Sequence, residues 1–304
     1  MHDTAVATML CGVSMNDPKF KDRFYGCMYG LAIGDALGMP VEFMERDTFP
    51  LVTDYLPNIH WDLEAGSWTD DTSMALCLAQ SLIEHGGFSH FDQLHKYWLW
   101  YRNGYMSVNG KCFDIGNTTR MALDNFYKTK QVISPYNGSQ YSGNGSLMRL
   151  APIPLYFYKT GLGNTELMSG ISSKTTHSSP ECISACEILG KLLYECFSGV
   201  HARDISIPDR IYDMTRREVK STGYVKDTLD AALWSFAKTN SFEECVLTAV
   251  NLGDDADTVG AVAGQIAGAY YGYAAIPERF ITGLQRRDLI ERITTGLYSS
   301  AINM

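Results

Sequence analysis

Two short acidic segments, far apart in the chain, carry the side chains best suited to chemistry. The first is Trp68-Thr69-Asp70-Asp71-Thr72 and the second is Gly253-Asp254-Asp255-Ala256-Asp257-Thr258. Each combines carboxylates with threonine hydroxyls at the start of an apolar stretch typical of a helix. Crowded carboxylates raise one another's pKa, so at neutral pH they need protons or a cation. The ligand atoms are all oxygens, which favours Mg²⁺ or Mn²⁺, and the absence of His and Cys argues against zinc.

Each segment taken alone has a simpler interpretation as a helix cap. Acidic side chains in a first turn stabilise a helix by about 0.3–1 kcal/mol without any metal. Two such segments, together with Glu42, favour one shared site if the fold brings them together. A pair of carboxylates could also act as general acid and base in the cleavage of a glycosidic bond. The spacing alone leaves both kinds of chemistry open.

Two polar loops that contain glycine are candidates for binding an anion. Residues 143–149 (Gly-Asn-Gly-Ser-Leu-Met-Arg) are expected to open a helix, where free N–H groups and the helix dipole favour a phosphate. They lack the third glycine of a dinucleotide fingerprint and the Lys-Ser/Thr of a P-loop, so an ordinary turn remains the alternative. Residues 113–119 are a similar loop before a helix, for which capping is the default interpretation.

His177 lies in a Ser- and Thr-rich turn that ends at Pro180. A single histidine is more often a hydrogen-bonded structural residue than a catalyst. Ser179 is better explained as a helix cap than as a nucleophile.

Helices are predicted to position these residues. Apolar residues recur at intervals of three and four in residues 73–85, 91–101, 117–127, 180–197, 225–238 and 241–251. Alternating runs typical of strands are nearly absent, and residues 51–61 are the least helical segment. We therefore expect a flexible leader over residues 1–22 and a single all-α domain over residues 23–304.

Two series of glycines recur at every fourth position, Gly26, Gly30, Gly34 and Gly38 in the first and Gly260, Gly264, Gly268 and Gly272 in the second. A glycine inside a helix costs roughly 1 kcal/mol relative to alanine, so each series needs compensation, which close backbone approach of a neighbouring helix would supply. Short apolar lengths interrupted by Asp35 and Gln265 argue against membrane-spanning helices. We expect two buried helices that pack closely, either on each other or on another neighbour, and that bring Glu42 near Asp257.

The bulk composition excludes some classes of function. The net charge of −9 and the absence of a Lys/Arg run argue against a nucleic-acid partner. Eight cysteines without a C-x-x-C pair indicate reduced thiols in an intracellular protein. No secretory signal is recognisable, so we expect a cytoplasmic location.

Six phrases along the chain together resemble one known family. They are Gly34-Asp35-Ala36-Leu37-Gly38 followed by Glu42, Thr69-Asp70-Asp71-Thr72, Phe113-Asp114-Ile115-Gly116-Asn117-Thr118, Gly143-Asn144-Gly145-Ser146-Leu147-Met148-Arg149, Thr176-His177, and Asp255-Ala256-Asp257-Thr258. In this order they resemble the ADP-ribosylglycohydrolase family, which includes dinitrogenase reductase-activating glycohydrolase and the ADP-ribosylhydrolases. The resemblance covers nearly the whole chain.

The resemblance implies a compact orthogonal helical bundle with two Mg²⁺ or Mn²⁺ ions at the base of a cleft. The implied metal ligands are Thr69, Asp70, Asp71, Asp255, Asp257 and Thr258. Asp114 or Glu42 would act as catalytic acid or base beside them. The residues implied to bind the substrate are Asn117, Gly143, Asn144, Gly145, Ser146 and His177.

The substrate implied by the resemblance is ADP-ribose attached to a protein side chain, with the metals holding the distal ribose and activating a water. The phrase around Asp114 is similar to the arginine-specific branch, so we expect ADP-ribosyl-arginine as substrate and ADP-ribose as product. The alternatives are a non-catalytic ADP-ribose-binding or structural relative, and a hydrolase of an O-linked serine or small-molecule conjugate. We expect a monomer without nucleic-acid or membrane partners.

Overall fold

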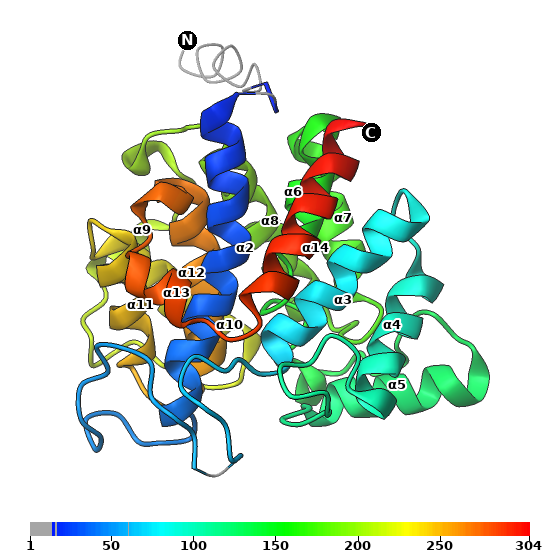
Figure 1. The fold of residues 1–304 in the computed structure, drawn as a ribbon, viewed down its shortest axis with the longest axis horizontal. Helices are drawn as coiled ribbons and strands as arrows, with labels where there is room; N and C mark the ends of the chain where they lie inside the picture. The colour runs from blue at the N-terminus through cyan, green and yellow to red at the C-terminus, as the bar shows by residue number, and fades with distance from the viewer. Residues whose placement is uncertain (1–13, 16, 60) are drawn as a thin grey trace.

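Helices make up almost all of the regular structure (Figure 1). The computed structural model describes residues 14, 15, 17–59 and 61–304. Within these residues, extended pairing is limited to two isolated bridges, Asn58 with Leu63 and Gly143 with Tyr224. The predicted all-α class is therefore confirmed.

The longest connections between successive α-helices are residues 39–69, 130–151 and 104–116. The α-helices are α2 (Pro18–Gly38), α3 (Asp70–His85), α4 (His90–Asn103), α5 (Asn117–Thr129), α6 (Pro152–Phe157), α7 (Leu162–Ser173), α8 (Pro180–Phe197), α9 (Asp209–Asp213), α10 (Val225–Ala237), α11 (Phe242–Val250), α12 (Ala256–Tyr271), α13 (Glu278–Gly283) and α14 (Arg287–Ile302). Short 3₁₀ turns are η1 (Met39–Val41), η2 (Ser139–Tyr141), η3 (Tyr158–Thr160), η4 (Ala202–Asp204) and η5 (Tyr273–Ala275). All six helices predicted from periodicity are present, with ends that differ by no more than three residues.

The predicted leader, residues 1–22, lies largely outside the described residues. Its last part is helical, because α2 begins at Pro18, a residue whose missing N–H suits a first turn. Asp17 caps this helix by accepting a hydrogen bond from the Lys19 N–H (2.8 Å). Phe20 is fully buried, with its ring against those of Tyr158 and Phe197. The packed helix thus begins inside the range predicted to be flexible.

Helices α2 and α12 lie against each other with their backbones in direct contact (Figure 1). A Cβ atom placed on Gly34 would lie 1.9 Å from the carbonyl oxygen of Gly260, and one on Gly30 would lie 2.1 Å from that of Gly264. The contact repeats at Gly26, whose Cβ would lie 2.3 Å from the oxygen of Gly268. The prediction that the two glycine series pack on each other is confirmed, since only glycine allows this approach.

This helix pair positions both halves of the acidic site. Helix α2 leads through η1 directly to Glu42, and α12 begins directly after Asp255. Both helices are buried along most of their length. None of the helices in the described part of the chain combines the length and apolar character needed to cross a bilayer.

The described cysteines are free thiols, as the sequence predicts. Six are buried and Cys112 is half-buried. Cys11 lies outside the described residues.

Candidate functional site

A cavity of about 320 Å³ brings together nearly all of the predicted site residues. It lies where the starts of α3, α5 and α12 meet the segment after η1. The predicted residues that line it are Glu42, Asp70, Asp71, Asp114, Asn117, Gly143, Asn144, Gly145, His177, Asp255, Asp257 and Thr258. Thr69 and Ser146 are not among the lining residues, so those two side chains need a separate account.

The first acidic segment is held in place by Asp35 of α2. Its carboxylate accepts hydrogen bonds from the N–H of Thr69 (2.9 Å), the N–H of Thr72 (3.0 Å) and the hydroxyl of Thr72 (2.6 Å). Asp35 therefore caps α3 from a neighbouring helix, and Thr69 makes no side-chain cap of its own. Asp71 lines the cavity, and its carboxylate oxygen Oδ2 is buried without a hydrogen-bond partner.

The second acidic segment is linked to the first by two threonine hydroxyls. The Thr69 hydroxyl donates to Asp257 Oδ2 (3.4 Å), and the Thr258 hydroxyl donates to Asp71 Oδ1 (3.3 Å). Asp255 accepts a hydrogen bond from the side-chain amide of Asn144 (2.9 Å). Segments from distant parts of the chain thus form one acidic cluster, as the glycine series predict.

The tightest group in the cluster is formed by Glu42, Asp114 and Asp257. One carboxylate oxygen from each lies within 4.8 Å of the other two. Asp114 lies in the loop before α5, and its own backbone is in the left-handed region (φ 58°). The sequence assigned Glu42 and Asp114 to catalysis and Asp257 to metal binding, and the geometry places all three together.

The electrostatics of the cluster favour protons or a cation. Burial, followed by the charges of Asp114, Asp255 and Asp70, raises the pKa of Glu42 to about 11. Burial also raises the pKa of Asp114 to about 7. Burial is also the largest cause of the raised pKa of the four remaining carboxyls in the cluster, those of Asp70, Asp71, Asp255 and Asp257.

The donor set fits a hard divalent cation. All its ligand atoms are oxygens, and Glu42 Oε2 and Asp71 Oδ2 are buried without a hydrogen-bond partner. Such orphaned carboxylate oxygens are costly unless a proton or an ion satisfies them. A cation bound among these carboxylates would favour their ionised forms and so reverse the direction of their pKa shifts.

The cavity also contains an open helix N-terminus. The residue that precedes α5, Gly116, provides no side-chain cap, and Asp114 does not cap the helix either. Asn117, Thr118 and Thr119 of its first turn line the cavity. The first-turn N–H groups and the helix dipole therefore favour an anionic group at this end of the cavity.

The glycine loop at residues 143–149 differs from its prediction. It forms turns, in which the N–H groups of Leu147 and Met148 both donate to the carbonyl of Asn144, and the next helix begins only at Pro152. The prediction that it opens a helix is wrong. The backbone N–H of Asn144 donates to the Gly223 carbonyl, and its side-chain amide donates to the Thr228 hydroxyl. These bonds hold the loop against the segment that leads into α10.

Ser146 is turned away from the cavity. Its hydroxyl accepts a hydrogen bond from Ser173 (2.8 Å) and is buried. The binding role predicted for its side chain therefore has no support in the geometry, whereas Gly143 and Gly145 do line the cavity.

His177 supports this loop from behind. Its ring is buried and would lie 2.8 Å from a Cβ placed on Gly145. Its Nδ1 shares a hydrogen bond with the Thr176 hydroxyl (2.8 Å). Burial, with a smaller contribution from the charge of Arg149, lowers the pKa of His177 to about 3. The imidazole is thus neutral at physiological pH.

Arg149 is a positioning residue that sequence reasoning missed. Its guanidinium donates to the Gly145 carbonyl (2.9 Å) and to the Thr176 hydroxyl (2.7 Å), and lies 4.5 Å from the centroid of the Tyr97 ring. It is buried, so it stabilises the loop and does not reach a ligand. Its place at the end of a Gly-rich phrase was the only signal in the sequence.

Comparison with known proteins identifies related chains. A sequence model of the ADP-ribosylglycohydrolase family matches residues 16–303. The chain is 39% identical over 294 residues to ADP-ribosylarginine hydrolase Tri1 of Serratia proteamaculans, covering 92% of this chain and 80% of the relative. It is 31% identical to the ADP-ribosyl-[dinitrogen reductase] glycohydrolase of Rhodospirillum rubrum, covering 90% of this chain and 94% of that one. A solved structure of an ADP-ribosylglycohydrolase-related protein complex superposes with a TM-score of 0.80 at 38% identity, over 93% of this chain and 99% of the other.

Proposed function

The chain belongs to the ADP-ribosylglycohydrolase family, and on this premise we propose that it hydrolyses the bond between ADP-ribose and a modified arginine side chain. The observation that carries the proposal is the acidic cluster, in which Glu42, Asp114 and Asp257 converge at a cavity large enough for part of a nucleotide. The relatives named as ADP-ribosylarginine hydrolases support arginine as the acceptor.

We assign two Mg²⁺ or Mn²⁺ ions to this cluster. The proposed ligands are Thr69, Asp70, Asp71, Asp255, Asp257 and Thr258, which the two threonine hydrogen bonds hold together. When bound, such ions would supply Lewis acidity and offset the negative charge of the carboxylates.

The remaining carboxylates handle protons. The reaction adds water across a C–N bond: the water oxygen bonds to the anomeric carbon, the bond to the guanidine nitrogen breaks, and a proton passes to the leaving guanidine. Glu42 and Asp114 share one environment but have pKa values raised to different extents, to about 11 and about 7. Carboxyl pairs of this kind divide into a proton donor and a proton acceptor. Either residue fits the role of base, and the other would hold the proton.

The rest of the cavity fits the ADP portion of the substrate. The open N-terminus of α5 favours the diphosphate, and Asn117 lies in its first turn. Gly143 and Gly145 line the cavity, and the neutral ring of His177 packs against Gly145. The acidic cluster then meets the distal ribose.

Release of ADP-ribose tests the proposal. Purified protein with Mg²⁺ or Mn²⁺ should release free ADP-ribose from an ADP-ribosyl-arginine peptide. Asp70→Asn and Asp257→Asn should reduce the rate by roughly 100-fold or more, since each removes a charged oxygen ligand from the centre. A serine-linked peptide measured in parallel reports the acceptor. Tight binding of ADP-ribose without turnover of either peptide would instead indicate a non-catalytic ADP-ribose-binding protein.

A further inference from the structure

A second cavity, of about 500 Å³, lies beside the first. Its walls are residues 43–46 and 219–222 together with Leu252 and Asp254. Phe43 lines both cavities, and Asp254 directly precedes Asp255 of the acidic cluster. The two cavities are therefore neighbours on either side of Phe43.

Phe43 is an unusual residue for its position. Its side chain is 73% exposed and its backbone is in the left-handed region (φ 61°), which is uncommon for an aromatic residue. Two backbone hydrogen bonds fix this conformation: the Phe43 N–H donates to the Asp254 carbonyl (2.7 Å), and the Asp254 N–H donates to the Met44 carbonyl (2.8 Å). The structure thus holds an exposed ring at the boundary of the two cavities, directly after Glu42.

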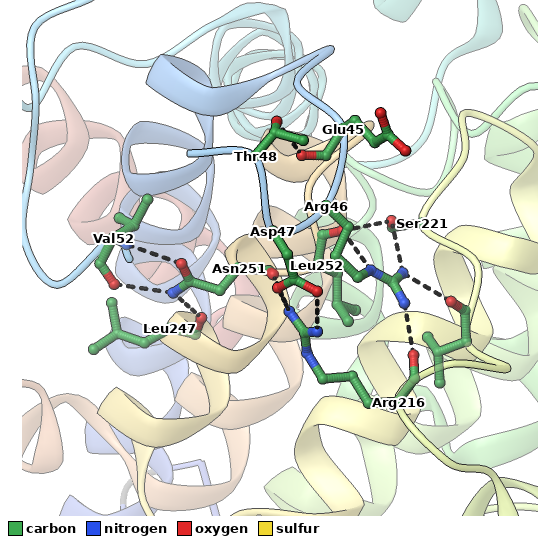
Figure 2. A network of polar contacts seen from close by, with 11 residues as sticks. Glu45, Arg46, Asp47, Thr48, Val52, Arg216, Ser221, Leu247, Asn251 and Leu252 are labelled. Atoms are coloured by element: carbon green, nitrogen blue, oxygen red, sulfur yellow. Dashed lines mark hydrogen bonds and ion pairs between the residues drawn. The ribbon is translucent and has the colours of Figure 1, made fainter. Parts of the chain in front are cut away.

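The walls of the second cavity are fixed by an arginine network (Figure 2). The Arg46 guanidinium donates to the carbonyls of Leu252 (2.8 Å), Arg216 (2.6 Å) and Val219 (2.8 Å). Arg216 in turn forms a two-point ion pair with Asp47. Because the Arg46 N–H groups are committed to carbonyls, Arg46 serves as a brace between the two walls.

The charged side chains that remain available are mostly acidic. Glu45 and Asp254 line the cavity, and within the described residues neither carboxylate forms a hydrogen bond or an ion pair. Lys220 is the available basic side chain among the lining residues. Two free carboxylates beside an aromatic face suit a planar cation such as a guanidinium.

We propose that this second cavity is the acceptor subsite, which takes the guanidinium and the methylene stem of the modified arginine, with the Phe43 ring against the guanidinium. The inference rests on the proposed function, which places ADP-ribose in the first cavity. The bond to be broken then lies beside Glu42, and the arginine side chain continues across Phe43. In this arrangement the Phe43 ring contacts the part of the substrate that leaves, so its substitution should affect turnover of the arginine conjugate more than binding of ADP-ribose.

Substitutions at Phe43 test the subsite. Phe43→Leu keeps a bulky apolar side chain at the same backbone position but removes the aromatic face, and Phe43→Trp keeps that face. We expect Phe43→Leu to lower kcat/KM for an ADP-ribosyl-arginine peptide by roughly 3- to 30-fold, the range that a single cation–π contact gives. Phe43→Trp should stay close to wild type. Leu51→Ala is the matched control, because Leu51 is also 73% exposed but lines neither cavity.

Binding of free ADP-ribose separates this inference from the proposed function. Phe43→Leu should lower kcat/KM for the arginine peptide by a larger factor than it lowers the affinity for free ADP-ribose, because the product lacks the guanidinium, and Leu51→Ala should change neither. If the wild type does not release ADP-ribose from the arginine peptide, the proposed function fails. If it does and Phe43→Leu matches it in kcat/KM, or if Phe43→Leu loses ADP-ribose affinity in proportion, the acceptor subsite alone is overturned.

Discussion

Asp35 determines the geometry of the first acidic segment without lying in the cavity. It is fully buried, and its two oxygens accept hydrogen bonds from the N–H groups of Thr69 and Thr72 at the start of α3 and from the Thr72 hydroxyl. Because Asp35 accepts these hydrogen bonds, the carboxylates of Asp70 and Asp71 are not needed to cap α3. A negative group near a helix N-terminus is stabilising in itself, so Asp35 serves stability and site geometry at once.

Asp35→Asn should therefore destabilise the protein far more than the same change at an ordinary cap. An amide has one acceptor oxygen and would leave at least one buried donor of α3 without a partner, which costs roughly 1.5–3 kcal/mol in the free energy of unfolding. Asp17→Asn is the control, because Asp17 caps α2 near the surface and asparagine caps nearly as well. Urea denaturation of both variants checks the prediction, and equal losses at the two sites would contradict it.

At the scale of elements, the contact of α2 with α12 sets the distance between Glu42 and Asp257. Backbone atoms face each other at the centre of this contact, so no flexible side chain can move aside to make room for a larger residue. Close packing of this kind transmits small displacements along whole helices.

Gly34→Ala should destabilise the fold by at least about 3 kcal/mol, because its methyl group would lie 1.9 Å from the Gly260 carbonyl oxygen. Gly163→Ala is the matched control: Gly163 lies in α7, and a Cβ there meets nothing within 4 Å. That change should stabilise the protein by about 0.5–1 kcal/mol. Denaturation measurements that showed similar effects for both alanines would refute the idea that the helices are in backbone contact.

The sequence predicted this helix pair because spacing by four is a local signal for one stripe of a helix. The two acidic segments could also be recognised from the sequence, because each is a short run of adjacent residues. Asp35 was not predicted as a cap, because its partners Thr69 and Thr72 lie on another helix. The burial of the Ser146 hydroxyl against Ser173 could not be predicted, since the position of a residue in a phrase does not say which way its side chain points. The segment between Val41 and Asp70 has no periodicity, so neither the Arg46 network nor the conformation of Phe43 could be predicted.

At the scale of the whole molecule, the buried carboxyls link stability to pH and to divalent ions. Asp114 has a folded pKa raised from 3.8 to about 7, and that of Glu42 is raised from 4.5 to about 11. The folded state thus binds more protons than the unfolded state above about pH 4.5, and stability falls as the pH rises through these values. His177, with its pKa lowered from 6.5 to about 3, acts in the opposite direction, but only below pH 6.5.

The melting temperature in EDTA should accordingly fall between pH 6.5 and pH 8, and millimolar Mg²⁺ should raise it and reduce this slope. The ion binds ionised carboxylates of the native state, so its stabilising effect should grow with pH. Differential scanning fluorimetry across this window, with and without the ion, measures both effects. A melting temperature unaffected by EDTA at pH 8 would count against a bound metal.

The pairing of α2 with α12 has a consequence for biosynthesis. On the ribosome, the helix that begins at Pro18 emerges long before the one that begins at Ala256 has been translated. Until then its glycine-lined face has no partner, and Asp70 and Asp71 have no opposing carboxylates with which to capture an ion. Under the proposed ligand assignment, the second half of the metal site would therefore be made only after most of the chain has been translated. A premature stop codon before Asp255 would yield a product that lacks Asp255, Asp257 and Thr258, even if most of its helices were intact.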